Sequence, residues 1–153
     1  MARRTKEDAA ETRSRLLDAA ELLFHEKGVS RTSLNDIALA AGATRGAIYW
    51  HFQDKADLFN AMMERVTLPL ESSLCRAGTQ ASADPLEDVC GGMLHALHVT
   101  VHDARARRVF EVATHRVEYA GELVALRQRH LAVRNECVAD LRDALQRAER
   151  YHG

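Results

Sequence analysis

Residues 42–55, GATRGAIYWHFQDK, set a tyrosine, a tryptophan and a histidine side by side in a very short segment. Thr44 is a favourable helix N-cap, and the helix that it predicts covers about residues 45–51. Ile48 and Phe52 are four residues apart, so they share one face of this helix and are expected to be buried. The aromatic triplet then points mostly outward and is predicted to be a contact surface.

A second short helix is predicted directly before this segment. Thr32 or Ser33 provides its N-cap, and its inward side chains recur at helical spacing, at Leu34, Ile37, Ala38 and Ala41. Gly42 supplies a left-handed turn residue between the two short helices, and a longer helix upstream runs from Thr5 to Gly28. Two short helices joined by a tight turn and packed on a longer one form a helix-turn-helix, whose second short helix enters the major groove of DNA.

The composition is that of a soluble, all-helical protein. The chain has 153 residues, of which 46% are apolar and 28% charged, and helix-forming residues dominate without strand-like alternation. No apolar run is long enough for a membrane span or a signal peptide, so we expect a cytoplasmic location and no membrane partner. The three cysteines are widely spaced and lack a CxxC pair, which indicates buried apolar groups rather than a metal or redox site.

The charge distribution favours local contacts with nucleic acid over general ones. The formal net charge is −1, and residues 1–68 carry as many Lys and Arg as Asp and Glu. Binding to DNA must therefore come from the placement of single cations. Lys55 is one of them, because it falls in the first turn of a fourth helix that starts at Asp54, where the helix dipole disfavours a cation unless a phosphate lies nearby.

The outward residues also have ordinary structural explanations. Trp50 is as compatible with a place at the edge of the core, against the fourth helix, as with contact to DNA. Arg45 and Lys55 are compatible with solvated surface charges. The hydroxyl group of Tyr49, at the end of a rigid apolar side chain, favours contact with a phosphate oxygen.

The remainder of the chain is predicted to form further helices. The fourth helix ends at Pro69, and residues 76–85 form a loop or a frayed helix end by composition. Three helices follow, at about residues 85–103, 104–115 and 122–151. One apolar stripe on the first of them consists of Leu86, Val89, Cys90, Met93, Leu97 and Val101, and one on the last consists of Leu123, Val124, Leu131, Val138, Leu141 and Leu145. Gly91 and Gly92 leave space of the kind that a ligand cavity needs.

From Thr12 to Leu68 the sequence resembles the tetracycline-repressor (TetR) family, through TSLNDIALAAGATRGAIYWHFQDKADLF, and in particular its multidrug-efflux repressor branch. The resemblance implies a three-helix helix-turn-helix DNA-binding domain over residues 1–53. It also implies a helical ligand-binding and dimerisation domain over residues 54–153, linked to the first through helix 4.

The resemblance further implies which residues bind which partner. Operator DNA would be contacted by Thr32, Ser33, Thr44, Arg45, Gly46, Tyr49, Trp50, His51 and Lys55, with Arg45 and Gly46 near bases and phosphate contacts among the others. Arg3 and Arg4 lie on an N-terminal arm that either reaches DNA or is a solvated tail. A pocket for a hydrophobic or aromatic inducer would be lined by Val66, Met93, Ala96, Phe110, Thr114, Cys137 and Leu141. These residues are equally compatible with a place in the ordinary hydrophobic core.

Metal and catalytic sites are not expected. His95, His98 and His102 follow one another at i, i+3 and i+7, so two of them could in principle share a metal ion. Neither a Cys pair nor an HExxH pattern accompanies them, which favours exposed or interface histidines able to titrate near neutral pH. The sequence shows no nucleophile–base motif, so we expect no enzyme activity and no cofactor.

The expected function is a ligand-responsive repressor that binds a pseudo-palindromic operator as a homodimer, with a multidrug efflux operon as its target. Members of the family usually continue into two further helices that build the dimer interface, whereas this sequence stops at Gly153. Operator binding needs two helix-turn-helix motifs that are spaced to meet successive major grooves, about 34 Å apart. The alternative is therefore a truncated helical ligand-binding or interaction module with impaired dimerisation and no repressor activity.

Overall fold

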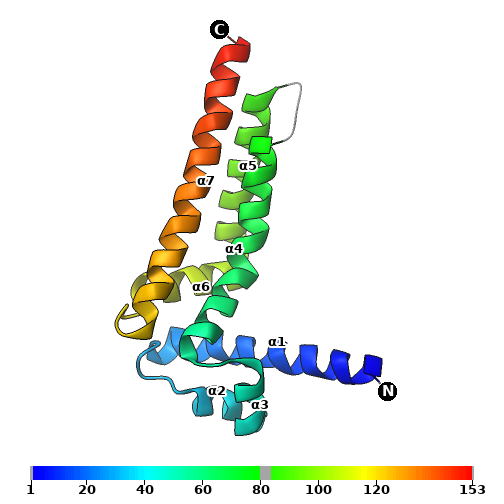
Figure 1. The fold of residues 1–153 in the computed structure, drawn as a ribbon, viewed down its shortest axis with the longest axis vertical. Coiled ribbons are helices and arrows are strands. Elements are labelled where there is room, and N and C mark those ends of the chain that lie inside the picture. The colour runs from blue at the N-terminus through cyan, green and yellow to red at the C-terminus, as the bar shows by residue number, and fades with distance from the viewer. Residues whose placement is uncertain (1, 80–83, 153) are drawn as a thin grey trace. The chain divides into compact units, whose positions relative to one another are not determined.

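Every regular element in the described part of the chain is a helix. The computed structural model describes residues 2–79 and 84–152 (Figure 1). Its helices are α1 (Ala2–Lys27), α2 (Leu34–Ala40), α3 (Arg45–His51), α4 (Lys55–Thr79), α5 (Pro85–His102), α6 (Ala104–His115) and α7 (Glu122–His152). None of the described helices combines the length and apolar character needed to cross a membrane. The predicted all-helical class is confirmed.

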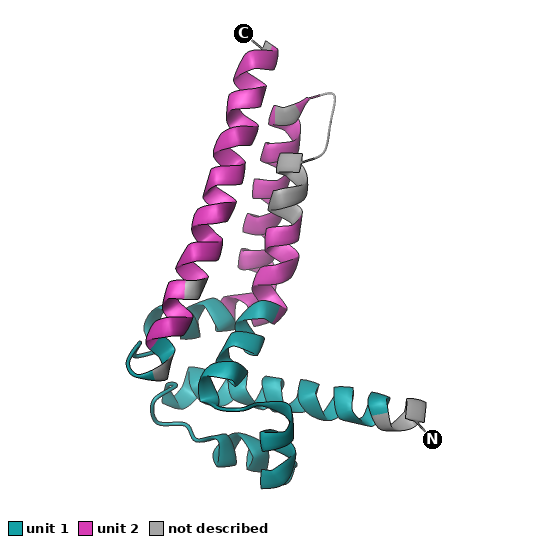
Figure 2. Cartoon of the chain, viewed as in Figure 1, with its two compact units in different colours: residues 1–64, 108–123 teal, residues 65–107, 124–153 magenta. Residues whose placement is uncertain are grey.

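The chain divides into two compact units (Figure 2). Unit 1 consists of Met1–Glu64 and Arg108–Leu123, and unit 2 of Arg65–Arg107 and Val124–Gly153. The predicted boundary between residues 53 and 54 lies before α4, whereas the first turns of α4 and part of α6 belong to the same unit as α1, α2 and α3. The assignment of functions to two domains stays a prediction.

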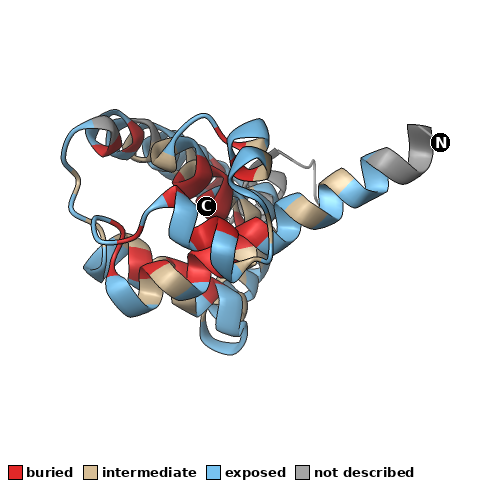
Figure 3. Cartoon of the chain, turned by 90° about the horizontal axis from the view of Figure 1, so that it is seen from below, coloured by how far each residue is buried: buried red, intermediate tan, exposed pale blue. Residues whose placement is uncertain are grey.

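The core of unit 1 is apolar and gathers on the inward sides of its helices (Figure 3). Its largest fully buried apolar side chains are Leu16, Leu17, Phe24, Val29, Ile37, Ile48, Phe52, Leu58, Phe59 and Met62. The rings of Phe24 on α1 and Phe59 on α4 lie 6.2 Å apart, centroid to centroid, in a tilted arrangement. This contact joins α4 to α1, on which α2 and α3 pack.

The C-terminal half of α6 is tied to α1 by polar contacts within unit 1. Arg108 lies 3.7 Å from the buried carboxylate of Glu21, and His25 lies 3.0 Å from Glu111. The hydrogen bond with His25 lowers the pKa of the Glu111 carboxyl group below its ordinary value. These contacts join segments that are far apart in the sequence.

Two predictions about helix ends were wrong. Helix α1 begins at Ala2 rather than Thr5, so Arg3 and Arg4 belong to a helix rather than to an arm. Pro69 does not end α4, which continues to Thr79, so residues 76–79 of the predicted loop or frayed helix end belong to this helix. Residues 80–83 lie outside the described residues. The buried side chains of Val66 and Leu70 flank the proline, and such packing outweighs its low helix propensity.

The apolar stripe predicted for α5 is mostly exposed, and half of the stripe predicted for α7 is exposed. Of the predicted stripe on α5, Val89 is buried, whereas Leu86, Cys90, Met93, Leu97 and Val101 are exposed. On α7 the predicted Leu123 is buried and Leu131 and Leu141 are half-buried, while the predicted Val124, Val138 and Leu145 are exposed. Leu126, Ala144 and Ala148, which were not predicted, are also buried. Periodicity identifies a helix face, but only another element packed on that face buries it.

The predicted burial of the cysteines is also corrected in part. Cys90 is exposed and Cys137 is half-buried, so the prediction of buried cysteines was wrong for Cys90. Cys75 lies outside the residues whose side chains the structure describes.

Candidate nucleic-acid interface

The start of α2 is fixed by a capping box centred on Ser33. The Ser33 hydroxyl group accepts a hydrogen bond from the Asp36 N–H at 3.1 Å and donates to the Asp36 carboxylate at 2.6 Å. The Ser33 N–H donates to the same carboxylate at 2.9 Å. These hydrogen bonds lower the pKa of Asp36 below its ordinary value. Ser33, rather than Thr32, is therefore the N-cap, and it is exposed.

The turn between α2 and α3 and the start of α3 match their predictions. Gly42 adopts the left-handed conformation, with φ 64°, which favours glycine there. The Thr44 hydroxyl group accepts a hydrogen bond from the Ala47 N–H at 3.1 Å, so Thr44 caps α3. A Cβ atom added to Gly46 would come no closer than 4.0 Å to the Thr44 hydroxyl oxygen. The fold itself therefore does not require a glycine at position 46.

The aromatic residues of α3 form an exposed surface. Ile48 and Phe52 are buried as predicted, whereas the side chains of Tyr49 and Trp50 are 50% and 73% exposed. An exposure of 73% excludes the alternative that places Trp50 at the edge of the core. The Arg45 guanidinium group lies 5.9 Å from the centre of the Tyr49 ring, and Arg45 itself is exposed.

A cluster of aromatic rings and one arginine lies at the C-terminal end of α3, and the sequence did not predict the arginine, Arg13. The ring of the half-buried His51 meets the Trp50 ring edge-on, with 4.6 Å between centroids. The guanidinium group of Arg13, on α1, lies 5.2 Å from the centre of the Phe52 ring. Burial, and then the charge of Arg13, lower the pKa of His51 below its ordinary value of about 6.5. No local sequence signal marked Arg13, because its neighbours on α3 lie far along the chain.

Two of the predicted contact residues are held inside unit 1. Thr32 is 1% exposed, and its hydroxyl group donates to the Gly28 carbonyl oxygen at 2.8 Å. The Lys55 ammonium group donates to the carbonyl oxygens of Val29, Ser30 and Thr32 at 3.0, 3.4 and 3.2 Å. In the free protein three carbonyl groups therefore compensate the charge that the helix-dipole argument assigned to a phosphate, and the DNA contact of Lys55 stays a prediction. The geometry favours structural roles for both residues.

Replacement of Thr44 by alanine should destabilise unit 1 by about 1 kcal/mol, because the Ala47 N–H loses its cap. Thermal or urea unfolding followed by fluorescence of Trp50, the sole tryptophan, measures this loss. Thr44→Ser keeps the hydroxyl group and is the matched control. Equal stability of Thr44→Ala and the wild-type protein would contradict a capping role.

The predicted inducer-lining residues are distributed over both units. Phe110 and Thr114 belong to unit 1, where the Thr114 hydroxyl group donates to the Phe110 carbonyl oxygen at 2.7 Å. Val66, Met93, Ala96, Cys137 and Leu141 belong to unit 2. Leu141 lines an open groove of about 590 Å³ along α7, together with Val138, Arg142, Leu145, Gln146 and Glu149. The other six residues do not line this groove.

The histidines of α5 form a pair rather than a triad. The rings of His98 and His102 are stacked with 4.2 Å between centroids, and His102 Nδ1 lies 3.0 Å from the His98 carbonyl oxygen. His95 is exposed. Within the described residues no group of three or more His, Cys, Asp or Glu side chains is arranged to hold a metal ion.

Comparison with known proteins matches the helix-turn-helix segment and the chain as a whole. Residues 16–62 match the sequence profile of the bacterial regulatory proteins of the tetR family. The HTH-type transcriptional regulator AcrR of Shigella flexneri is 43% identical over 138 residues, which cover 90% of this chain and 63% of AcrR. The HTH-type transcriptional regulator TtgR of Pseudomonas putida is 40% identical over 151 residues, which cover 98% of this chain and 71% of TtgR.

A similar fold has been solved for a repressor bound to a small molecule. The SmeT–triclosan complex superposes with a TM-score of 0.81 at 36% identity, over 92% of this chain and 67% of SmeT. SmeT is described as the repressor of the Stenotrophomonas maltophilia multidrug efflux pump SmeDEF. The chain thus spans between about three fifths and three quarters of the length of these relatives.

Proposed function

Because the chain belongs to the tetR family of bacterial regulatory proteins, we propose that it is a ligand-responsive transcriptional repressor of a multidrug efflux operon. In this proposal it binds a pseudo-palindromic operator as a homodimer, with α3 in the major groove. AcrR and TtgR are named as transcriptional regulators, and SmeT as a repressor of an efflux pump.

The observation that carries the proposal is that α3 has one exposed face, while its opposite face is buried in the core of unit 1. Ile48 and Phe52 anchor the helix, while Tyr49 and Trp50 remain largely exposed. A helix-turn-helix places its second short helix in the major groove with its N-terminal residues against base edges. Arg45 and Gly46 occupy that end of α3, and a glycine there allows the backbone to approach the bases closely.

The operator can be found by selection from a pool of random-sequence DNA duplexes, followed by measurement of affinity for the selected sequences. We expect enrichment of an inverted repeat whose half-sites lie one or more helical turns apart, bound by two protomers. The stoichiometry follows from the mass of the complex in solution. A monomeric protein that enriches no sequence would contradict the proposal and favour the interaction module.

Tyr49→Phe should weaken operator binding roughly tenfold for each protomer bound, because a hydrogen bond to a charged phosphate contributes about 1.5 kcal/mol or more. The phenylalanine keeps the ring next to the Arg45 guanidinium group, so the helix surface stays intact. Fluorescence anisotropy with the selected duplex measures the affinity. An affinity equal to that of the wild-type protein would remove the Tyr49 hydroxyl group from the interface.

We further propose that a hydrophobic or aromatic ligand lowers operator affinity. Such a ligand acts only if it binds the DNA-free conformation more tightly than the DNA-bound one. Helix α4 is continuous from unit 1 into unit 2 and is therefore suited to transmit the change. Triclosan, which is bound in the SmeT structure, is a suitable first probe. Unchanged operator affinity at a triclosan concentration that saturates the protein would exclude triclosan as an inducer.

A further inference from the structure

We propose that Arg13 of α1 contacts the DNA backbone and supplies the positive charge at the C-terminal end of α3. The inference rests on the proposed function and adds a residue from outside the helix-turn-helix to its interface.

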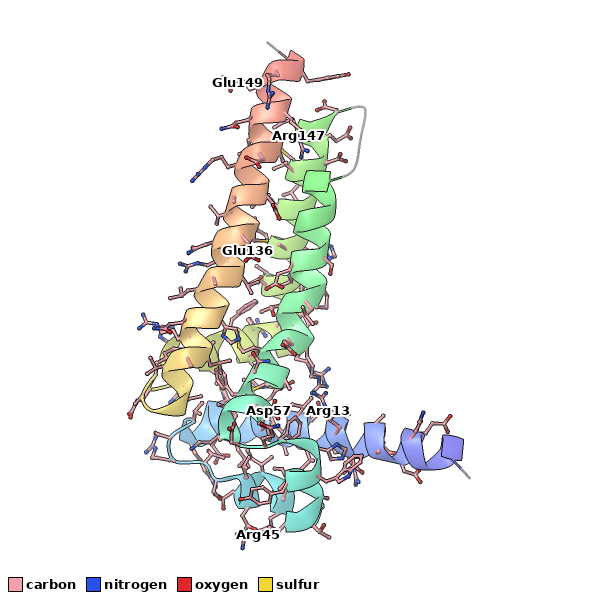
Figure 4. The ribbon with its side chains drawn as sticks, in the orientation of Figure 1. Arg13, Arg45, Asp57, Glu136, Arg147 and Glu149 are labelled. Carbon is pink, nitrogen blue, oxygen red and sulfur yellow. The ribbon has the colours of Figure 1, made fainter. Side chains whose placement is uncertain are left out.

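Arg13 is held next to α3 by its contact with Phe52. The Phe52 N–H donates to the Ile48 carbonyl oxygen at 2.9 Å, so Phe52 is the C-cap of α3, and its ring is buried. The guanidinium group of Arg13 lies 5.2 Å from the centre of this fixed ring, while Arg13 itself remains exposed. Figure 4 labels Arg13 on α1 and Arg45 at the first residue of α3. Arg13 and Arg45 therefore lie at opposite ends of α3.

The C-terminal end of α3 requires a cation if a phosphate is to bind there. A helix C-terminus carries a partial negative charge, which repels an anion. His51, at this end, is a predicted phosphate contact, but burial and the neighbouring Arg13 lower its pKa, which favours the neutral imidazole. A neutral imidazole group can hydrogen-bond a phosphate without neutralising it, and Arg13 provides the missing charge.

The sequence around Arg13 leaves its charge uncompensated on α1. The positions one helical turn before and after it are Ala9, Ala10, Leu16 and Leu17, none of which can form an ion pair. Arg15 differs, because Glu11 and Asp18 lie one turn away on either side. In a region whose charges otherwise balance, DNA binding depends on single cations that have no acidic neighbour. Arg13 is such a cation, because no acidic residue lies one helical turn from it on α1.

The ordinary explanation is that Arg13 merely packs on Phe52 and compensates the dipole of α3. The two explanations differ in the salt dependence of DNA binding. Each phosphate contact contributes about 0.9 to the slope of log affinity against log salt concentration, whereas a purely structural residue contributes nothing to it.

The test measures this slope for the full chain and a duplex selected by the wild-type protein. For Arg13→Gln we expect a loss of about 0.9 from the magnitude of the slope for each protomer bound. Arg13→Lys keeps the charge and should keep the slope. Arg15→Gln is the matched control, because it removes an exposed arginine two positions away on the opposite side of α1, and it should also keep the slope.

A second readout tests the geometry in the free protein. Removal of the Arg13 charge should raise the pKa of His51, as followed by nuclear magnetic resonance, whereas Arg15→Gln should leave it unchanged. A wild-type slope in Arg13→Gln would overturn the inference while leaving the proposed function intact. If the wild-type protein binds no duplex in a salt-dependent manner, the proposed function and this inference both fall.

Discussion

Phe59→Ala should lower the free energy of unfolding of unit 1 by about 3–5 kcal/mol, the usual cost of truncating a buried phenylalanine. Phe59 is fully buried, and its ring packs 6.2 Å from that of Phe24. The substitution removes apolar contact area, leaves a cavity and breaks an aromatic pair between α1 and α4. Because these helices carry α2 and α3, operator affinity should fall together with stability.

Urea unfolding followed by Trp50 fluorescence reports on unit 1, since the chain has one tryptophan and it lies on α3. Trp50→Ala is the matched control, followed by circular dichroism, because it truncates an aromatic side chain that is mostly exposed. We expect this control to change stability by less than about 0.5 kcal/mol. Similar losses of stability in both variants would mean that burial on α4 does not determine the stability of unit 1.

The parts of the fold that follow from local signals could be predicted from the sequence. The bounds of α3 follow from the Thr44 cap and from the spacing of Ile48 and Phe52, and the structure confirms them. The turn at Gly42 is likewise local, because a left-handed backbone conformation favours glycine wherever it occurs. Such signals involve residues within one or two helical turns of one another.

The parts that depend on distant residues could not be predicted in this way. The exposed apolar side chains of α5, Met93 among them, have the same spacing as buried ones, and only the packing partner differs. Arg13 and Phe52 meet although 39 positions separate them in the sequence. The helical pattern of the sequence thus identifies α3, but it does not identify Arg13 as the cation at the C-terminal end of α3.

Lys55 is the clearest case, and Lys55→Met should destabilise unit 1 by about 2–3 kcal/mol. The substitution removes three charge-assisted hydrogen bonds to the turn that joins α1 and α2. A hydrogen bond to a charged group contributes about 1.5–3 kcal/mol, but Lys55 is only half-buried, so water can replace part of the loss. Loss of this anchor should also displace Ser33 and α2, and so weaken operator binding.

Two measurements separate this role from the predicted phosphate contact. Urea unfolding should show the loss of stability in Lys55→Met, because a lysine that contacted only DNA would leave the free protein unchanged. The salt dependence of operator affinity should keep its wild-type slope, since no phosphate contact is lost. Unchanged stability together with a slope reduced by about 0.9 per protomer would instead restore Lys55 as a DNA contact. In that case the three carbonyl groups would contribute little to holding the turn, and the ammonium group would exchange them for a phosphate when DNA binds.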